Sequence, residues 1–316
     1  MHRVARLALI CFLAALLPVA TASATPPRKI LASTFPIYQM TRNITAGASG
    51  VVVELLLPAR LGCPHDYALT PQEMQKLRRA EVLIINGRGL EEFLGAPLQR
   101  AHPGLTVIDS SRGSTAFIPD RAVGAKAEQV ADADDHADHA DHAGVNPHLF
   151  ASPRMAAEQV LTIAAELARL DPATGPLYQR NATAYAARLE GLAADFAALG
   201  QTLSNRRIIT QHGVFAYLAR DMGLEVVAVV SVHPGQEPAA AEMLALIRQA
   251  KGEKVGAIFT EPQYPDRVAA TIAREAGIPH AVLDPAANGA DDAPLDSFET
   301  TMRHNLQILQ STLGSR

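Results

Sequence analysis

Two sets of short apolar runs, separated by one long helical stripe, constrain the fold of this chain more than any other feature of its sequence. The runs have the length and composition of buried strands, and segments with helical periodicity lie between them. Strands that alternate with helices are typical of parallel sheets built from βαβ units, so we predict an α/β fold with two lobes. The predicted strands are Ile30–Ser33, Val51–Leu57, Val82–Asn86 and Thr106–Asp109 in the first set, and Ile208–Thr210, Val226–Val230, Ala257–Thr260 and Ala281–Asp284 in the second.

The stripe between the two sets runs from Tyr178 to Leu203, with its large residues at alternating spacings of four and three. This spacing places them on one face of a helix. A helix from Pro172 to Leu203, with Asp171 as its cap, would be about 48 Å long. We expect a linker helix within 171–204 that lies across two lobes, 25–170 and 205–316, and holds them at a fixed separation. An isolated coiled-coil arm is the alternative, but the stripe is too short for a stable one.

Residues 1–24 have the parts of a secretory signal peptide. Arg3 and Arg6 form a basic start, Leu7–Ala20 is apolar, and Ala22-Ser23-Ala24 is a small-residue cleavage site. The apolar run is short for a membrane span, although an uncleaved anchor is the alternative. We therefore expect cleavage near Ala24 and a periplasmic mature protein.

Composition excludes several classes of protein. The formal net charge is −4, and no basic cluster offers a surface for nucleic acid or for an anionic membrane. With 48% hydrophobic residues and no second long apolar run, the mature chain has the composition of a soluble globular protein. It retains one cysteine, Cys63, so an intrachain disulfide is impossible.

Two histidines share a sequence context that favours a binding role. His65 in "GCPHDYALTP" and His148 in "NPHLFASP" each follow a proline, and a second proline opens a helix shortly afterwards. His212 follows the predicted strand 208–210, and Asp284 ends the strand 281–284. In α/β folds the carboxyl ends of strands are where ligands collect. A lone histidine more often has no ligand, and it is the repeated context that favours a site here.

Three neutral imidazoles and one carboxylate form the four-coordinate set that Zn²⁺ favours in proteins. Nitrogen-rich ligation also favours zinc over manganese or calcium, which prefer more oxygen ligands. We therefore predict a zinc site formed by His65, His148, His212 and Asp284. Cys63 is an alternative ligand, through its thiolate, and water or another acid is an alternative to Asp284.

The segment 116–144 is rich in Ala and Asp, has no periodicity and ends in "HADHADH". We interpret it as a mobile surface loop. His136, His139 and His142 can bind zinc there, but each binding event must order the loop, so their affinity should be lower than that of the main site. We predict a secondary, low-affinity metal site that gathers or senses zinc. A solvated acidic loop without a role is the alternative.

The chain resembles the zinc/manganese class of ABC-transporter solute-binding proteins, cluster A-I, and especially its zinc-uptake branch. The resemblance covers nearly the whole mature chain. It implies two α/β lobes joined by a long rigid helix, with metal bound in the cleft between them by His65, His148, His212 and Asp284. Manganese members carry a carboxylate where His212 stands. The matching stretches are "CPHDYALTPQEMQKLRRAEVLIINGRGLEEFL", "NPHLFASP", "TQHGVFAYLARDMGL" and "FTEPQYPDRVAATIAREAGIPHAVLDP".

The resemblance implies a monomeric extracytoplasmic receptor that captures Zn²⁺ and delivers it to the membrane permease of an ABC importer, without catalysis. A manganese receptor of the same class is the first alternative. A secreted zinc hydrolase is another, but the chain has no HExxH motif. Adhesion, known among relatives of the family, has no feature here to support it. We interpret the remaining histidines as surface residues, while three residues could also line the cleft: His233, Glu237 and Glu261.

Overall fold

The computed structural model describes residues 28–62, 64, 67–119, 144–231 and 238–314. Several features that the sequence singles out lie outside these ranges. They are the signal peptide 1–24, most of the loop 116–144 and the residues Cys63, His65, His136, His139, His142, His233 and Glu237. Among the helices that the structure does describe, none combines the length and the apolar character needed to cross a bilayer.

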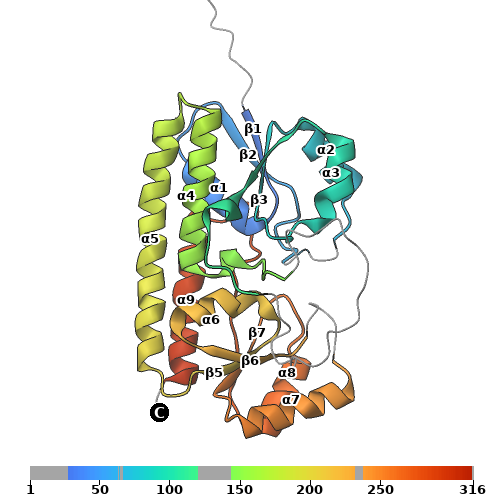
Figure 1. Ribbon diagram of the computed structural model, residues 1–316, viewed down its shortest axis with the longest axis vertical. Helices are drawn as coiled ribbons and strands as arrows, with labels where there is room; N and C mark the ends of the chain where they lie inside the picture. The colour runs from blue at the N-terminus through green and yellow to red at the C-terminus, as the bar shows by residue number, and fades with distance from the viewer. Residues whose placement is uncertain (1–27, 63, 65–66, 120–143, 232–237, 315–316) are drawn as a thin grey trace, which may run out of the picture.

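The chain forms two four-stranded parallel sheets with the same strand order, one in each lobe (Figure 1). The first sheet has the order β2-β1-β3-β4 and the second the order β6-β5-β7-β8. The predicted two-lobe α/β fold is therefore confirmed. The strands are β1 (Arg28–Ala32), β2 (Val51–Leu55), β3 (Val82–Ile85), β4 (Thr106–Asp109), β5 (Arg207–Thr210), β6 (Glu225–Val229), β7 (Ala257–Thr260) and β8 (His280–Val282).

Helices follow the strands in both lobes, and the helices predicted to open at Pro71 and Pro153 begin there. At the start of α2, the Thr70 backbone N–H donates to Glu73 Oε2 at 2.6 Å, which is one half of a capping box. The first lobe contains α1 (Phe35–Thr45), α2 (Pro71–Arg79), α3 (Gly95–Ala101), α4 (Pro153–Leu170) and the short 3₁₀ turns η1 (Glu92–Leu94), η2 (Ser110–Gly113) and η3 (Leu149–Ala151). The second contains η4 (Gly213–Phe215), α6 (Ala216–Met222), α7 (Ala240–Gly252), α8 (Arg267–Ala276) and α9 (Ser297–Leu313).

The predicted long helix is α5 (Gly175–Thr202), with 28 residues. It lies along one side of the molecule and contacts α1 and α4 of the first lobe as well as α6 and α9 of the second (Figure 1). At Gly200 a Cβ atom would lie 1.9 Å from the carbonyl oxygen of Met222, so only glycine lets α5 approach the backbone of α6 this closely. The helix is therefore packed directly against both lobes.

The predicted start of this helix at Pro172 is wrong, because a second long helix, α4, occupies the chain just before it. Asp171 ends α4 instead of capping α5. Its carboxylate accepts hydrogen bonds from the Thr174 N–H at 3.4 Å and from the Tyr178 hydroxyl at 3.2 Å. These bonds stabilise a tight turn, so that α4 and α5 pack side by side (Figure 1).

A second connection joins the lobes at α1. Arg42 Nη1 donates to the Ala293 carbonyl at 2.6 Å, and Asn43 Nδ2 donates to the Leu295 carbonyl at 2.9 Å. Arg188 of α5 completes this connection, because its guanidinium bonds both Glu299 of α9 and Asn43 of α1. One apolar core cluster includes residues of both sheets and of α5. The lobes are thus joined both by the long helix and by the segment between β8 and α9.

Candidate metal centre

The structure brings His148 and His212 together from different lobes. Their ring centroids lie 5.1 Å apart and the ring planes are at 80° to each other. His148 lies directly before η3, and His212 lies between β5 and η4. The residues are only 4% and 1% exposed, so the two imidazoles form a buried pair where the lobes meet. This is where the sequence predicts both of them to lie.

His148 is held by Asn146. Asn146 Oδ1 lies 2.9 Å from the backbone nitrogen of His148 and 2.9 Å from its ring Nδ1. The side-chain amide also reaches the other lobe, because Asn146 Nδ2 donates to the Gly213 carbonyl at 2.8 Å. Asn146 is 4% exposed, so these bonds are shielded from water.

His212 is held by Glu261, the first residue after β7. The Glu261 carboxylate Oε1 bonds His212 Nδ1, and its Oε2 accepts from Gln263 Nε2 at 2.7 Å. Glu261 is 1% exposed. Burial raises the pKa of this carboxyl, while the contact with His212 acts in the opposite direction. The ring of Tyr264 stands edge-on to His212, with centroids 6.0 Å apart.

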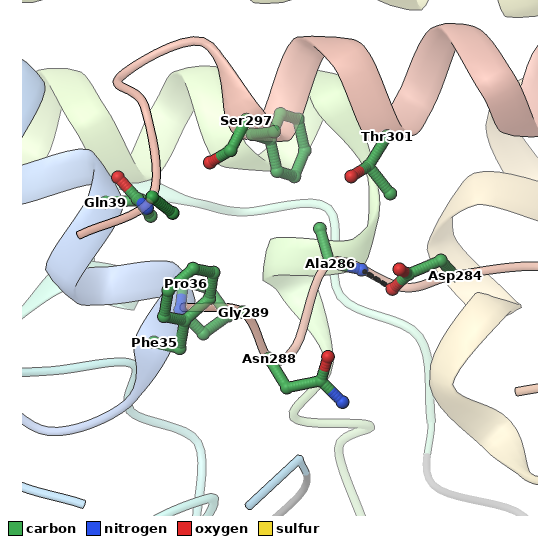
Figure 2. Close-up of a pocket in the computed structure, with 11 residues that line it drawn as sticks. Phe35, Pro36, Gln39, Asp284, Ala286, Asn288, Gly289, Ser297 and Thr301 are labelled. Carbon is green, nitrogen blue, oxygen red and sulfur yellow. Dashed lines mark hydrogen bonds between the residues drawn. The ribbon is translucent and has the colours of Figure 1, made fainter. Parts of the chain in front are cut away.

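Asp284 lies two residues beyond the end of β8, and not at its last position as predicted. The backbone N–H of Asp284 donates to Asn305 Oδ1 of α9 at 3.0 Å, and Asn305 Nδ2 donates to the carbonyl of Asp284 at 2.6 Å. Asp284 Oδ1 accepts from the Ala286 N–H at 2.8 Å, as Figure 2 shows. Burial raises the pKa of Asp284, and the negative charge of Asp284 in turn raises that of Glu261. The two carboxyl groups therefore interact electrostatically.

Asp284 also borders a cavity of about 250 Å³ between the lobes (Figure 2). Phe35 and Gln39 of α1 line one side of this cavity, and Ser297 and Thr301 of α9 line another. Asp284 therefore borders space where α1 of the first lobe faces α9 of the second, and its role as a metal ligand stays a prediction.

His65 is outside the described residues, so the predicted set of four ligands stays a prediction. Within the parts of the chain that the structure describes, no group of three or more His, Cys, Asp and Glu residues is arranged to hold a metal. The chain leading to His65 does pass the site. A Cβ atom on Gly62, three residues earlier, would lie 3.3 Å from Gln263 Cγ, and Gln263 bonds Glu261.

Sequence reasoning missed the role of Asn146 and treated Glu261 only as a residue that could line the cleft. A signal was present, because histidines that bind metal commonly donate their second ring N–H to an acceptor, and Asn146 stands two residues before His148.

The interpretation of the remaining histidines as surface residues fits His304, which is exposed. It does not fit His280, which is partly buried and bonds the Thr260 hydroxyl at 2.9 Å.

The arrangement suits a divalent cation of the zinc type. Both histidines have Nδ1 in a hydrogen bond, so coordination falls to Nε2 on each ring. Supporting hydrogen bonds of this kind fix the ring orientation and raise the basicity of the coordinating nitrogen. Two buried imidazoles with carboxylates nearby supply nitrogen ligands and negative charge to one place.

Comparisons with known proteins find relatives that are named for zinc uptake and zinc binding. The chain is 28% identical over 288 residues to the high-affinity zinc uptake system protein ZnuA of Bacillus subtilis (strain 168), covering 90% of this chain and 87% of that protein. It is 26% identical to the zinc-binding lipoprotein AdcA of Streptococcus pneumoniae serotype 4, of which it spans only 55%.

Solved structures of metal-bound proteins are also similar to this chain in fold and in sequence. The SBP FpvC of P. aeruginosa in complex with Ni²⁺ is 30% identical with a TM-score of 0.75, over 91% of this chain and 97% of that one. A zinc-bound deletion mutant of ZnuA is 30% identical with a TM-score of 0.73, over 92% and 99%. The family model described as zinc-uptake complex component A, periplasmic, matches residues 30–312, and the chain therefore belongs to the ZnuA family.

Proposed function

We propose that this protein is an extracytoplasmic receptor that captures Zn²⁺ between its lobes and delivers it to the membrane permease of an ABC importer. The observation that carries the proposal is the buried pair of imidazoles, one from each lobe, with Nδ1 of each ring bonded to an acceptor. Membership of the ZnuA family and the similarity to proteins named for zinc uptake support it. The protein acts by binding and release and needs no bond chemistry.

The proposed ligands are His65, His148, His212 and Asp284, with Glu261 and Asn146 supporting the two central rings. The cation gives up water for nitrogen ligands that the protein has already oriented. In the same proposal the mature protein works as a monomer in the periplasm, after removal of residues 1–24. The loop histidines His136, His139 and His142 form a weaker, secondary zinc site.

Competition with a chromogenic chelator tests the zinc site on the purified mature protein. We expect tight zinc binding that falls by at least about 100-fold in each of His148→Ala, His212→Ala and His65→Ala. A matched histidine control is His304→Ala, since His304 is exposed on α9. Zinc binding that survives all three ligand substitutions unchanged would contradict the proposal.

Manganese is the alternative cargo, because FpvC has also been solved with Mn²⁺ and is 31% identical to this chain. The two buried imidazoles favour zinc, since manganese prefers oxygen ligands. Titration of Mn²⁺ against protein loaded with Zn²⁺ decides between them. Displacement of zinc by equimolar manganese would assign the receptor to manganese.

A further inference from the structure

Asn146 makes contact with both imidazole-bearing segments through a single side chain. Its Oδ1 faces the backbone nitrogen and ring Nδ1 of His148, and its Nδ2 faces the carbonyl of Gly213, the residue after His212. We propose that Asn146 is a positioning residue that fixes the ring of His148 and its distance from His212. This inference rests on the proposed zinc-binding function.

The hydrogen bonds of Asn146 determine which nitrogen of His148 carries the proton. The backbone N–H of His148 can only donate and the carbonyl of Gly213 can only accept, so the amide has one possible orientation. The oxygen that faces His148 Nδ1 must therefore accept a hydrogen bond, and Nδ1 must carry the hydrogen. The lone pair for a metal is consequently on Nε2.

The backbone of Asn146 is held as firmly as its side chain. Its N–H donates to the Ile118 carbonyl at 2.8 Å, and its carbonyl accepts from the Tyr217 hydroxyl at 2.8 Å. The next residue, Pro147, has its carbonyl bonded by Asn86 Nδ2 at 2.8 Å. Because its backbone and side-chain polar groups are all hydrogen-bonded, Asn146 can couple the position of one lobe to that of the other.

Asn43 provides a matched control for the loss of a buried amide between the lobes. It is 7% exposed, its Nδ2 donates to the Leu295 carbonyl at 2.9 Å, and its Oδ1 accepts from Arg188 at 3.3 Å. Its contacts are to α1, α5 and the segment before α9, and none is to a histidine. Removing it loosens the lobes without touching the rings.

The first experiment compares Asn146→Ala with Asn43→Ala by chelator competition for Zn²⁺ and by thermal unfolding. We expect Asn146→Ala to weaken zinc binding by about 10- to 100-fold, as loss of a partner that orients a ligand does. Asn43→Ala should change affinity by less than about threefold while lowering thermal stability to a similar extent. Equal losses of affinity in the two variants would overturn the proposal.

The second experiment determines the tautomer of the His148 ring directly, in metal-free protein. Nitrogen-15 NMR of the histidine side chains should show His148 protonated at Nδ1 in the wild type and in Asn43→Ala, and a mixture of tautomers in Asn146→Ala. An unchanged tautomer in Asn146→Ala would overturn the proposal. Should the wild-type protein fail to bind zinc, the proposed function falls while this measurement still tests Asn146.

Asn146→Asp separates the two halves of the role. Aspartate keeps an acceptor for His148 Nδ1 but loses the donor to Gly213, and it places a carboxylate oxygen against that carbonyl. We expect the Nδ1-protonated tautomer to persist, while the visible absorption spectrum of bound Co²⁺ differs from that of the wild type. A wild-type Co²⁺ spectrum in this variant would overturn the claim that Asn146 sets the spacing between the rings.

Discussion

The two lobes have the same strand order but hold their histidines by different means. In the first lobe the supporting groups are neutral amides, since Asn146 holds His148 and Asn86 holds Pro147. In the second lobe Glu261 holds His212, and Asp284 interacts electrostatically with Glu261. The first lobe therefore contributes fixed geometry to the site, and the second contributes the negative charge that compensates a bound cation.

Asn86→Ala should disturb the fixed geometry that the first lobe contributes to the site, and it should have the largest effect on stability. Asn86 is fully buried, donates to Pro147 and accepts from Gln159 Nε2 at 3.0 Å. Both partners lose a bond in the variant, so we expect the free energy of unfolding to fall by about 3 kcal/mol. Urea denaturation measures it, with the partly exposed Asn205→Ala as control. If the free energy of unfolding fell by less than about 1 kcal/mol, the hydrogen bonds of Asn86 would not be what holds the geometry of this lobe.

Glu261→Gln tests the charge contributed by the second lobe. The glutamine keeps the shape but removes the negative charge and no longer specifies which nitrogen of His212 carries the proton. We expect zinc affinity to fall by about 10- to 100-fold, or about 1.4–2.7 kcal/mol. Glu299→Gln is the control, because Glu299 is also buried but pairs with Arg188 away from the histidines. Similar losses in both variants would remove the distinction between the lobes.

Glu91 gives the first lobe a pH dependence of its own. Burial raises the pKa of this carboxyl to about 7, although Ser33 and two backbone N–H groups donate to it. The folded state then binds more protons than the unfolded state between about pH 4.5 and 7, so stability should decline as pH rises through this window. The slope cannot exceed about 1.4 kcal/mol per pH unit for one group.

The measurement for Glu91 is urea denaturation of metal-free protein at several pH values. Glu91→Gln should flatten the profile between pH 5 and 7 relative to the wild type. A profile as steep as that of the wild type would place the titrating group elsewhere, with Glu261 and Asp284 the first to examine, since burial raises the pKa of both.

The smallest expected effect is that of His304, whose charge lowers the pKa of Asp284. His304 is exposed, so solvent screens its charge. We expect His304→Ala to change zinc affinity by no more than about twofold, and chelator competition checks this. A larger change would mean that charge at a distance contributes to the part of the site that the second lobe supplies.

Much of the fold could be predicted from sequence because it depends on local patterns. Apolar runs placed the strands to within a few residues, and the stripe from Tyr178 to Leu203 predicted α5. The start of α5 was wrong because Asp171 could cap a following helix or end a preceding one, and only packing between α4 and α5 decides which.

The candidate site was less predictable. The position of His212 after a strand was expected, but Glu261 bonds His212 across 49 residues of sequence, and Asn146 bonds Gly213 across 67, which no local spacing encodes. The same holds for the second connection between the lobes, where Asn43 meets Leu295 far along the chain.

The shared apolar core has a consequence for attempts to divide the protein. Ile30 and Ile84 of the first sheet belong to the same packed cluster as Ile208 and Phe259 of the second, with α5 between them. A fragment ending at residue 170, or one starting at residue 205, would leave one side of that cluster in water. Although the two sheets look like a duplicated unit, neither half should fold when expressed by itself.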